Sequence, residues 1–206
     1  MGLFFIKDLI IKNLRSENNM ISIYTDGGCN NYHSEKIGAW AFILFKKTNE
    51  DIKQILNNYR SLKEGSTTEN NNFITYKAEG VTQTSNNKME LSAAIFALKE
   101  YEKLVVANPQ LASEEVFLYS DSMYLINGIN AWIEKWKENN WKTYKGSEVK
   151  NKDLWELLDN FKNKYSKIKF VWVKGHDVDD FNIECDSCVQ ECIRELDEKI
   201  KNEKNN

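Results

Sequence analysis

The hydrophobic and polar positions first predict three consecutive strands. Nearly continuous apolar runs at Ile21–Thr25 and Gly38–Lys47 are typical of buried strands. A third strand is expected at Phe73–Val81, and the polar segment 48–72 is expected to loop out of the fold before it. The first half of the domain is therefore predicted to be strands with no helix between them.

The rest of the chain alternates helix and strand. Residues 85–104 place apolar side chains on one helical face, with Asn86 or Asn87 available as the helix cap. A strand at Val116–Ser120 is expected to lead into short helical pieces within 123–136. A helix, a strand and a final helix are then expected at Lys152–Lys164, Lys169–Lys174 and Asn182–Lys201. Three strands followed by this alternation predict a mixed α/β sheet.

The two ends of the chain are set apart from this pattern. Residues 1–19 form an N-terminal extension whose apolar residues recur at helical spacing, which allows a short amphipathic helix, an interaction element or an extension of little consequence. Residues 202–206 form a polar tail. A chain of 206 residues suits one domain of ordinary size, here expected over 20–201, with a polar insertion near 48–72.

The composition is that of a globular protein without an overall basic surface. Hydrophobic residues make up 41% of the chain, and the formal net charge is −3. Any nucleic-acid-binding face must therefore be local. The chain has no apolar run of about eighteen residues, and its first twenty residues do not resemble a signal peptide. We expect a cytoplasmic protein with no membrane partner.

The cysteines allow two interpretations. They are Cys29, Cys185, Cys188 and Cys192. The last three recur at helical spacing and could form either part of an apolar helix face or a zinc site. A zinc site on one helix needs a fourth ligand, which the sequence does not offer nearby, so the apolar face is favoured and the thiols are expected to be reduced.

Four acids stand where the pattern does not predict a solvated charge. Asp26 and Asp121 each end a strand of the buried type, while Glu90 and Asp186 are expected in the first turns of their helices. If the two strands are parallel neighbours, their carboxyl ends bring Asp26 and Asp121 to one edge of the sheet. Each acid alone could equally cap a turn or a helix. Clustered carboxylates repel one another and need cations, and magnesium or manganese prefers oxygen ligands.

Several motifs in a fixed order resemble a known family. They are "YTDGGC", "TSNNKMEL", "YSDSMYLINGINAWIEKWKENNWKT", "VKNKDLW", and "VWVKGH" followed by "NIECD". Through these motifs, residues from about 20 to 198 resemble the type 1 ribonucleases H, metal-dependent nucleases that cut the RNA strand of RNA–DNA hybrids. The resemblance implies a ribonuclease H-like fold, with a five-stranded mixed sheet of order 3-2-1-4-5 flanked by helices.

The resemblance also implies a catalytic site. Asp26, Glu90, Asp121 and Asp186 match the metal-binding acids, which hold two Mg²⁺ ions that Mn²⁺ can replace, and Asp26 bridges both ions. His176 matches a mobile-loop histidine that aids proton transfer or product release. The implied protein is a monomeric endonuclease that leaves 5′-phosphate and 3′-hydroxyl ends.

Contacts to the RNA strand carry over by position. The residues that match the family's contacts near the minor groove, where 2′-hydroxyls distinguish RNA from DNA, are Cys29, Asn30, Asn86, Asn87 and Met123. Gly27 and Gly28, which let a backbone approach closely, and Asn182 are counted with them as substrate-binding residues. Met123 stands where a glutamine is frequent, so only its backbone can donate a comparable hydrogen bond.

Contacts to the DNA strand are expected on a second surface. Ser85 and Asn151 match a pocket that grips a DNA-strand phosphate, with Gln83 standing where some members have arginine. The residues that resemble the family's basic protrusion are Trp132, Trp136, Lys137, Trp141 and Lys142. Residues 135–152 contain six lysines and two glutamates, a local charge of +4. The alternative for the tryptophans is packing beneath a solvated lysine face.

Some features depart from the family pattern and leave rival interpretations. The turn "NNYHSEKIG" replaces a glycine- and proline-rich turn, and the loop after His176 carries three additional acids, Asp177, Asp179 and Asp180, which are expected to alter metal affinity or repel phosphates. One rival is a binding module that has lost its chemistry, against which the four acids argue. Another is a resolvase or integrase core, against which the "KGH" and "NIECD" ending and the tryptophan-rich protrusion argue.

Overall fold

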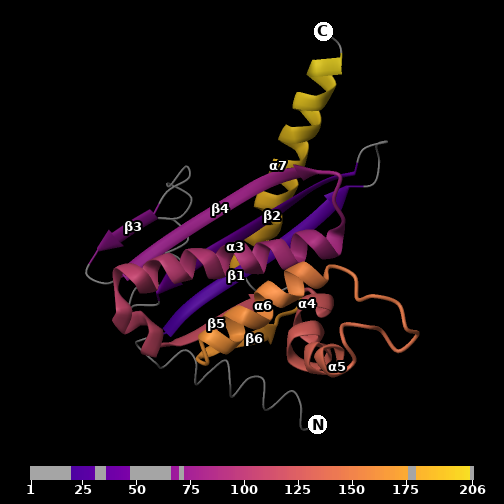
Figure 1. Cartoon of the computed structure of the whole chain (residues 1–206). Helices are drawn as coiled ribbons and strands as arrows, with labels where there is room; N and C mark the ends of the chain where they lie inside the picture. Colours follow the sequence, from indigo (N-terminus) through magenta and orange to yellow (C-terminus); the bar gives the residue numbers. More distant parts are fainter. Residues whose placement is uncertain (1–19, 31–35, 47–65, 70–71, 176–179, 205–206) are drawn as a thin grey trace, which may run out of the picture.

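Six strands and the helices around them make up the described part of the chain (Figure 1). The computed structural model describes residues 20–30, 36–46, 66–69, 72–175 and 180–204. The N-terminal extension 1–19 and most of the insertion near 48–72 lie outside these residues. No helix in the described ranges combines the length and the apolar character that a membrane crossing requires.

The antiparallel half of the sheet consists of neighbours along the chain. Strands β1 (Met20–Asn30), β2 (Ile37–Lys46) and β4 (Asn72–Thr82) pair antiparallel. A short strand, β3 (Ser66–Glu69), pairs with β4 at the edge of the sheet. The prediction that 48–72 loops out as a whole is therefore wrong for its last part, because a threonine-containing segment there suits an edge strand.

The parallel half adds two strands on the other side of β1. Strand β5 (Glu115–Ser120) pairs parallel with β1, and β6 (Ile168–Trp172) pairs parallel with β5. The full order is β3-β4-β2-β1-β5-β6. Without the short β3, this is the predicted mixed five-stranded sheet of order 3-2-1-4-5, which is confirmed.

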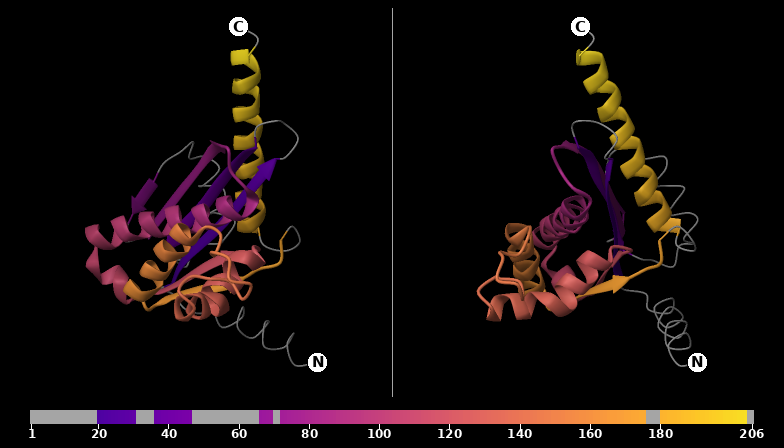
Figure 2. Two further views of the ribbon diagram at one scale, coloured as in Figure 1. Left: turned by 45° about the vertical axis from the view of Figure 1, so that its right-hand side comes forward. Right: turned by 90° about the vertical axis from the view of Figure 1, so that its right-hand side faces the viewer.

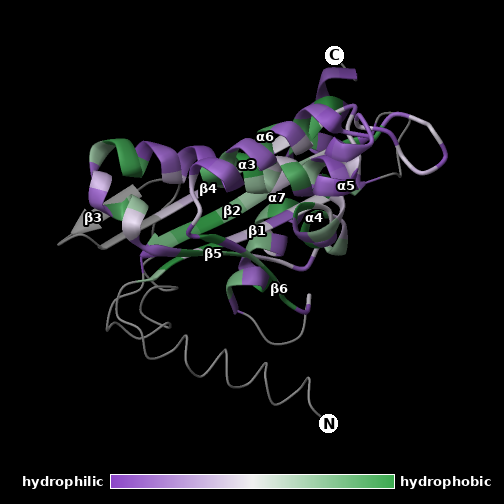
Figure 3. Cartoon of the chain, turned by 60° about the horizontal axis from the view of Figure 1, so that its bottom comes forward, coloured by the Kyte–Doolittle hydropathy of each residue, from purple (hydrophilic) through white to green (hydrophobic). Residues whose placement is uncertain are grey.

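Helices cover both faces of the sheet (Figure 2). Helices α3 (Asn86–Ala107) and α6 (Lys152–Lys164) lie on one face, and α7 (Asp180–Lys204) crosses the other and extends beyond the sheet. Four short helical segments connect these elements: η1 (Pro109–Ser113), α4 (Met123–Asn127), the π-helical η2 (Gly128–Trp132) and α5 (Ile133–Glu138). Hydrophobic residues concentrate on the central strands between the helical layers (Figure 3).

Two helix starts differ from the sequence prediction. The cap of α3 is Ser85, whose side chain makes no capping hydrogen bond, so Asn86 and Asn87 are the first helical residues and not its cap. Helix α7 begins at Asp180, two residues earlier than predicted, since Phe181 packs against Phe45 and Tyr24 on the sheet. Helix α6 has the predicted bounds.

The cysteines of α7 belong to its apolar face, as predicted. Cys185 is fully buried with Phe181 against β2, and Cys188 and Cys192 lie partly buried beside the same helix face. All four cysteines of the chain are free thiols. Within the described ranges, the one group of three or more potential metal ligands consists of acids and includes no cysteine.

Candidate functional site

Strand β1 carries Asp26 to the edge where its parallel pairing ends. The parallel register of β1 and β5 runs as far as Tyr24 and Tyr119, and Asp26 and Asp121 lie two residues beyond it on their chains. The prediction that both acids share one sheet edge is confirmed. The prediction that Asp26 ends its strand is wrong, because antiparallel pairing with β2 continues past it, from Asp26 opposite Ala41 as far as Asn30.

Helix α3 brings Glu90 against the same edge. A Cβ atom on Gly27 would lie 2.3 Å from the backbone N of Glu90 and 2.3 Å from the backbone C of Met89, so only glycine allows this approach. The backbone N–H of Gly27 donates a hydrogen bond to the Glu90 carboxylate. Glu90 is the fifth residue of α3 and thus lies in its second turn, not in the first turn as predicted.

Three carboxylates meet at this point. Asp26, Glu90 and Asp121 each offer an oxygen, and these oxygens all lie within 4.8 Å of one another. Asp26 and Glu90 are buried, and Asp121 is half-buried. The Glu90 Oε2 atom is buried without a hydrogen-bond partner among the described residues. An anionic, all-oxygen donor set with an unsatisfied buried atom fits a hard divalent cation such as Mg²⁺ or Mn²⁺.

The same crowding perturbs the titration of Glu90. Burial raises the pKa of Glu90 well above its usual range, and the negative charges of Asp26 and Asp121 raise it further. The hydrogen bond from Gly27 opposes this rise by stabilising the carboxylate. Without a cation, the folded protein therefore holds a proton at this group more tightly than the unfolded chain does.

We expect Glu90→Gln to stabilise the metal-free protein at neutral pH. Because the folded-state pKa of Glu90 is raised, wild-type stability falls as pH rises from the usual glutamate range toward that raised pKa, and the glutamine variant lacks this decline. Denaturant unfolding in EDTA across this pH range measures the difference. Added Mg²⁺ should raise the free energy of unfolding of the wild type more than that of the variant. Identical pH profiles would contradict the assignment.

Two neighbours hold Asp121 in place. Its backbone oxygen accepts a hydrogen bond from Trp172 Nε1 at 3.1 Å, and its Oδ2 accepts one from Asn182 Nδ2 at 3.4 Å. A Cβ atom on Gly175 would lie 2.3 Å from Asp121 Oδ2. Asn182 is only 2% exposed, and its side chain helps to orient Asp121; its predicted role in substrate binding stays a prediction.

Helix α7 places Asp186 beside β1 but outside the three-acid group. The adjacent Cys185 donates from Sγ to the Tyr24 backbone oxygen at 3.5 Å, and Val189 packs against Gly28. Asp186 is half-buried and accepts a hydrogen bond from a glutamine one turn further along. Because α7 begins at Asp180, Asp186 lies in the second turn and not in the first.

The loop between β6 and α7 is only partly described. His176 and the additional acids Asp177 and Asp179 lie outside the described residues. Asp180, the third additional acid, is exposed at the start of α7. The predicted role of His176 therefore stays a prediction.

The residues expected to contact RNA lie on β1, α3 and α4, which carry or follow the three acids. Cys29 and Asn30 end β1, and Cys29 Sγ donates to the Thr84 backbone oxygen at 3.8 Å, which ties β1 to the loop that enters α3. Asn86 and Asn87 are exposed at the start of α3. Met123 is 52% exposed at the start of α4, directly after the segment that holds Asp121.

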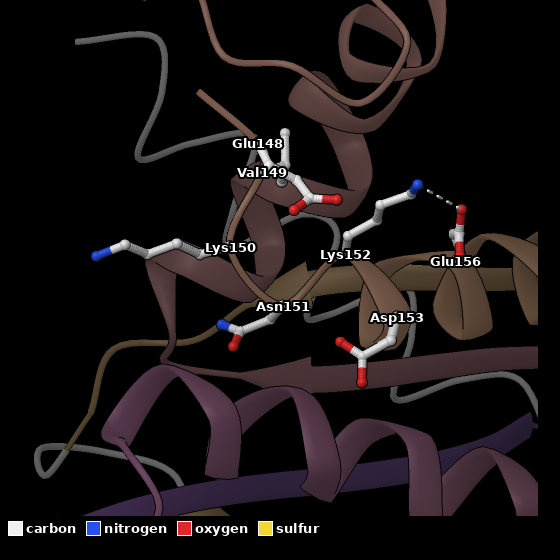
Figure 4. Close-up of a pocket in the computed structure, with 7 residues that line it drawn as sticks. All are labelled: Glu148, Val149, Lys150, Asn151, Lys152, Asp153 and Glu156. Atoms are coloured by element: carbon white, nitrogen blue, oxygen red, sulfur yellow. Dashed lines mark ion pairs between the residues drawn. The ribbon is translucent and has the colours of Figure 1, made fainter. Parts of the chain in front are cut away.

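The residues expected to grip a DNA phosphate lie on neighbouring helix starts. Ser85 is exposed at the start of α3, and Gln83, with φ of 53°, precedes it. Asn151 begins α6 in a left-handed conformation, with φ of 57° and ψ of 34°. It lines a depression in which its amide and the Lys150 side chain point to the same side, whereas Lys152 points toward Glu156, 3.8 Å away (Figure 4).

The protrusion is less basic than its sequence indicates. Lys137 Nζ lies 2.9 Å from Asp159 on α6 and 3.4 Å from Glu134, so these acids neutralise it. Lys142 is exposed and forms no ion pair within the part of the chain that the structure describes. The local charge of +4 was counted over residues 135–152 and therefore did not include Asp159.

The tryptophans of the protrusion are mainly structural. Trp136 and Trp141 are half-buried and pack against the main core, as the packing alternative predicts. Trp132 contacts Trp136, with ring centroids 5.7 Å apart, and also contacts Tyr124. The sequence pattern does not indicate a role for Tyr124, because a tyrosine on an apolar helical segment is typical of core packing.

Comparisons with known proteins agree on one family. The family model for RNase H matches residues 18–194. A protein named ribonuclease H from Clostridium botulinum is 38% identical over 178 residues, covering 85% of this chain and 97% of the relative. Another from Acetivibrio thermocellus is 38% identical over 180 residues, covering 87% of this chain and 98% of the relative.

Solved structures show the same fold. LC9-RNase H1, described as a type 1 RNase H with the type 2 active-site motif, aligns with a TM-score of 0.58 at 19% identity, covering 86% of this chain and 73% of that chain. LC11-RNase H1 in complex with an RNA/DNA hybrid aligns with a TM-score of 0.54 at 20% identity, covering 85% of this chain and 98% of that chain.

Proposed function

Since this chain belongs to the RNase H family, we propose that it is an endonuclease that hydrolyses the RNA strand of RNA–DNA hybrids. The observation that carries the proposal is the convergence of Asp26, Glu90 and Asp121, from two strand edges and a helix, within 4.8 Å. A buried anionic cluster of this kind is costly unless it binds cations. The presence of this cluster supports metal-dependent chemistry rather than a binding module.

We propose that the acids hold two Mg²⁺ ions, which Mn²⁺ can replace. Asp26 is assigned to both ions; Asp186 is assigned to one of them, and Glu90 and Asp121 to the other. Bound divalent cations would supply an activated water and stabilise the leaving oxygen of the phosphodiester. Asp186 is half-buried on α7, which packs against β1, and this supports its assignment as a ligand from the helix side.

The reaction follows from the bond that hydrolysis breaks. The oxygen of water forms a bond to the phosphorus of RNA while the bond from phosphorus to the 3′-oxygen breaks. The 3′-oxygen takes a proton, which leaves a 3′-hydroxyl and a 5′-phosphate. His176 is proposed to aid this proton transfer or the release of product, because its imidazole titrates near neutral pH.

Substrate selection is proposed to use both strands. On the RNA side, Cys29, Asn30, Asn86, Asn87 and the backbone of Met123 would contact the minor groove, where the 2′-hydroxyls lie. On the DNA side, Ser85 and Asn151 would hold a phosphate, and the exposed lysines of the protrusion would lie along the backbone. All three clustered acids come from one chain, so we propose that the monomer is active.

A comparison of three substrates tests this function. RNA–DNA hybrid, duplex DNA and duplex RNA of one sequence are incubated with the protein and Mg²⁺. We expect cleavage of the hybrid alone, in its RNA strand, with 5′-phosphate ends on the products. Cleavage of duplex DNA would favour a resolvase-like nuclease instead. Binding of the hybrid without turnover would favour a module that has lost its chemistry.

The protrusion lysines should differ in their effect on binding. We expect Lys142→Ala to weaken hybrid binding and to reduce the slope of log K against log salt by about 1, because one phosphate contact is lost. Lys137→Ala should change the slope less but destabilise the fold, since it leaves Asp159 buried without its partner. Hybrid affinities at several salt concentrations and thermal unfolding separate the two effects. Equal salt slopes for both variants would contradict this distinction.

A further inference from the structure

Tyr124 links the acid site to the start of α6 through one hydroxyl group. Its Oη atom donates to the Lys150 backbone oxygen at 3.4 Å. The same atom accepts hydrogen bonds from Asn151 Nδ2 at 3.4 Å and from Trp155 Nε1 at 3.2 Å. A tyrosine hydroxyl has one hydrogen to donate and two lone pairs that accept. All of this capacity is used by Lys150, Asn151 and Trp155, which lie at the start of α6 or just before it.

The hydroxyl completes the restraint on Asn151. The backbone of Asn151 is already held, since its carbonyl oxygen accepts from the backbone N–H groups of Leu154 and Trp155, both at 3.1 Å. Its left-handed conformation is one that asparagine adopts readily. An amide nitrogen carries two hydrogens, so donation of one to Tyr124 fixes the direction of the other. That second hydrogen would be available to a phosphate on the side of Asn151 to which the Lys150 side chain also points (Figure 4).

The ring of Tyr124 is itself fixed by packing. It lies tilted against Trp155, with centroids 5.2 Å apart, and edge-on against Trp132, with centroids 6.1 Å apart. Trp155 is fully buried, and its ring packs directly on Gly128. A Cβ atom added to Gly128 would lie 2.0 Å from a ring atom of Trp155, so the ring cannot move in that direction. The hydroxyl is therefore held at a defined point and can act as a rigid anchor.

The anchor is close in sequence to the acid site. Helix α4 begins two residues after Asp121 and carries Tyr124 as its second residue. The Ser122 side chain caps this helix by accepting from the backbone N–H of Leu125 at 3.3 Å. Asp121, Tyr124 and Asn151 thus form a short and rigid path between two surfaces that are far apart in sequence.

We infer that Tyr124 is a positioning residue whose hydroxyl aims the Asn151 amide at a DNA-strand phosphate and fixes its distance from the acids. The inference rests on the proposed function. Because the DNA phosphate and the cleaved RNA phosphodiester belong to one duplex, this fixed distance determines which RNA linkage reaches Asp26, Glu90 and Asp121. The specificity-determining feature is the hydroxyl group and not the aromatic ring.

Tyr124→Phe tests the inference because it removes only the hydroxyl. We expect KM for the hybrid to rise about threefold to tenfold, because the Asn151 amide is no longer held toward the phosphate and its hydrogen bond to the substrate weakens, while kcat stays within about twofold. Asn151→Ala should also raise KM, and the double variant should match Asn151→Ala alone, because Tyr124 acts through that residue. Tyr165→Phe is the matched control, since it removes a hydroxyl that donates to Glu102 at 3.2 Å, at the opposite end of α6 from Asn151.

A second measurement uses the substrate. A hybrid with one neutral methylphosphonate in its DNA strand is prepared for each linkage in turn. At one linkage of the DNA strand, the methylphosphonate should raise KM for the wild type. The increase in KM at that linkage should be smaller for Tyr124→Phe. Three results would overturn the inference. They are an unchanged KM for Tyr124→Phe, a KM for the double variant that is the product of the two single increases, or an equal effect of the methylphosphonate on wild type and Tyr124→Phe. Absence of hybrid cleavage by the wild type would instead contradict the proposed function.

Discussion

Asp26→Asn is expected to reduce the rate of hybrid cleavage at least about a hundredfold in saturating Mg²⁺. Asp26 is a buried member of the acid group, and the substitution keeps its shape while removing its charge. An amide is a weaker ligand for a hard cation than a carboxylate, so kcat should fall more than hybrid affinity. Single-turnover cleavage of a labelled hybrid, together with hybrid binding, measures both quantities.

A surface acid provides the control for this substitution. Glu191 pairs with Arg194 three residues further along α7, with an Oε1–Nη2 distance of 3.3 Å, and its side chain is 61% exposed. Glu191→Gln should leave cleavage unchanged and alter the free energy of unfolding by less than about 1 kcal/mol. Cleavage by Asp26→Asn at near the wild-type rate would remove Asp26 from the site.

Gly27→Ala should both destabilise the protein and abolish most of its activity. The added Cβ would lie 2.3 Å from backbone atoms of Met89 and Glu90, which cannot rotate away, so α3 must shift from β1. We expect a loss of about 3 kcal/mol in the free energy of unfolding and a fall in Tm of about 6 to 12 °C. The shift also displaces Glu90 from the acid group. Thermal unfolding and hybrid cleavage measure the two effects.

The neighbouring glycine supplies a matched comparison. A Cβ atom on Gly28 would lie 2.8 Å from Val189 Cγ1, the end of a side chain that can move. Gly28→Ala should therefore cost less stability than Gly27→Ala and leave Glu90 in place. Equal losses in both variants would contradict the account of how α3 approaches β1.

Local patterns predicted the sheet and half of the site because these depend on short-range signals. The apolar runs gave the strands of the five-stranded sheet, and the periodicity of 152–164 gave α6 with its observed bounds. Two strands that end near acids placed Asp26 and Asp121 at one edge, as observed. The placement of Glu90 beside them depended on the family resemblance.

The remaining features depend on contacts between distant segments. The length of β1 beyond Asp26 is set by its pairing with β2, which the apolar run alone does not show. The pairing of Lys137 with Asp159 joins two helices, and a count of charges along the chain cannot include it. The roles of Asn182 and Tyr124 likewise arise from hydrogen bonds to residues 61 and 26 to 31 positions away.

The most direct test of the account is strand-resolved cleavage of an RNA–DNA hybrid that carries a different label on each strand. With Mg²⁺, the wild-type protein is expected to cut internal linkages of the RNA, to leave the DNA intact and to release 5′-phosphate ends, and EDTA is expected to stop the reaction. An intact RNA strand with Mg²⁺ or Mn²⁺, or undiminished cleavage in EDTA, would contradict the account.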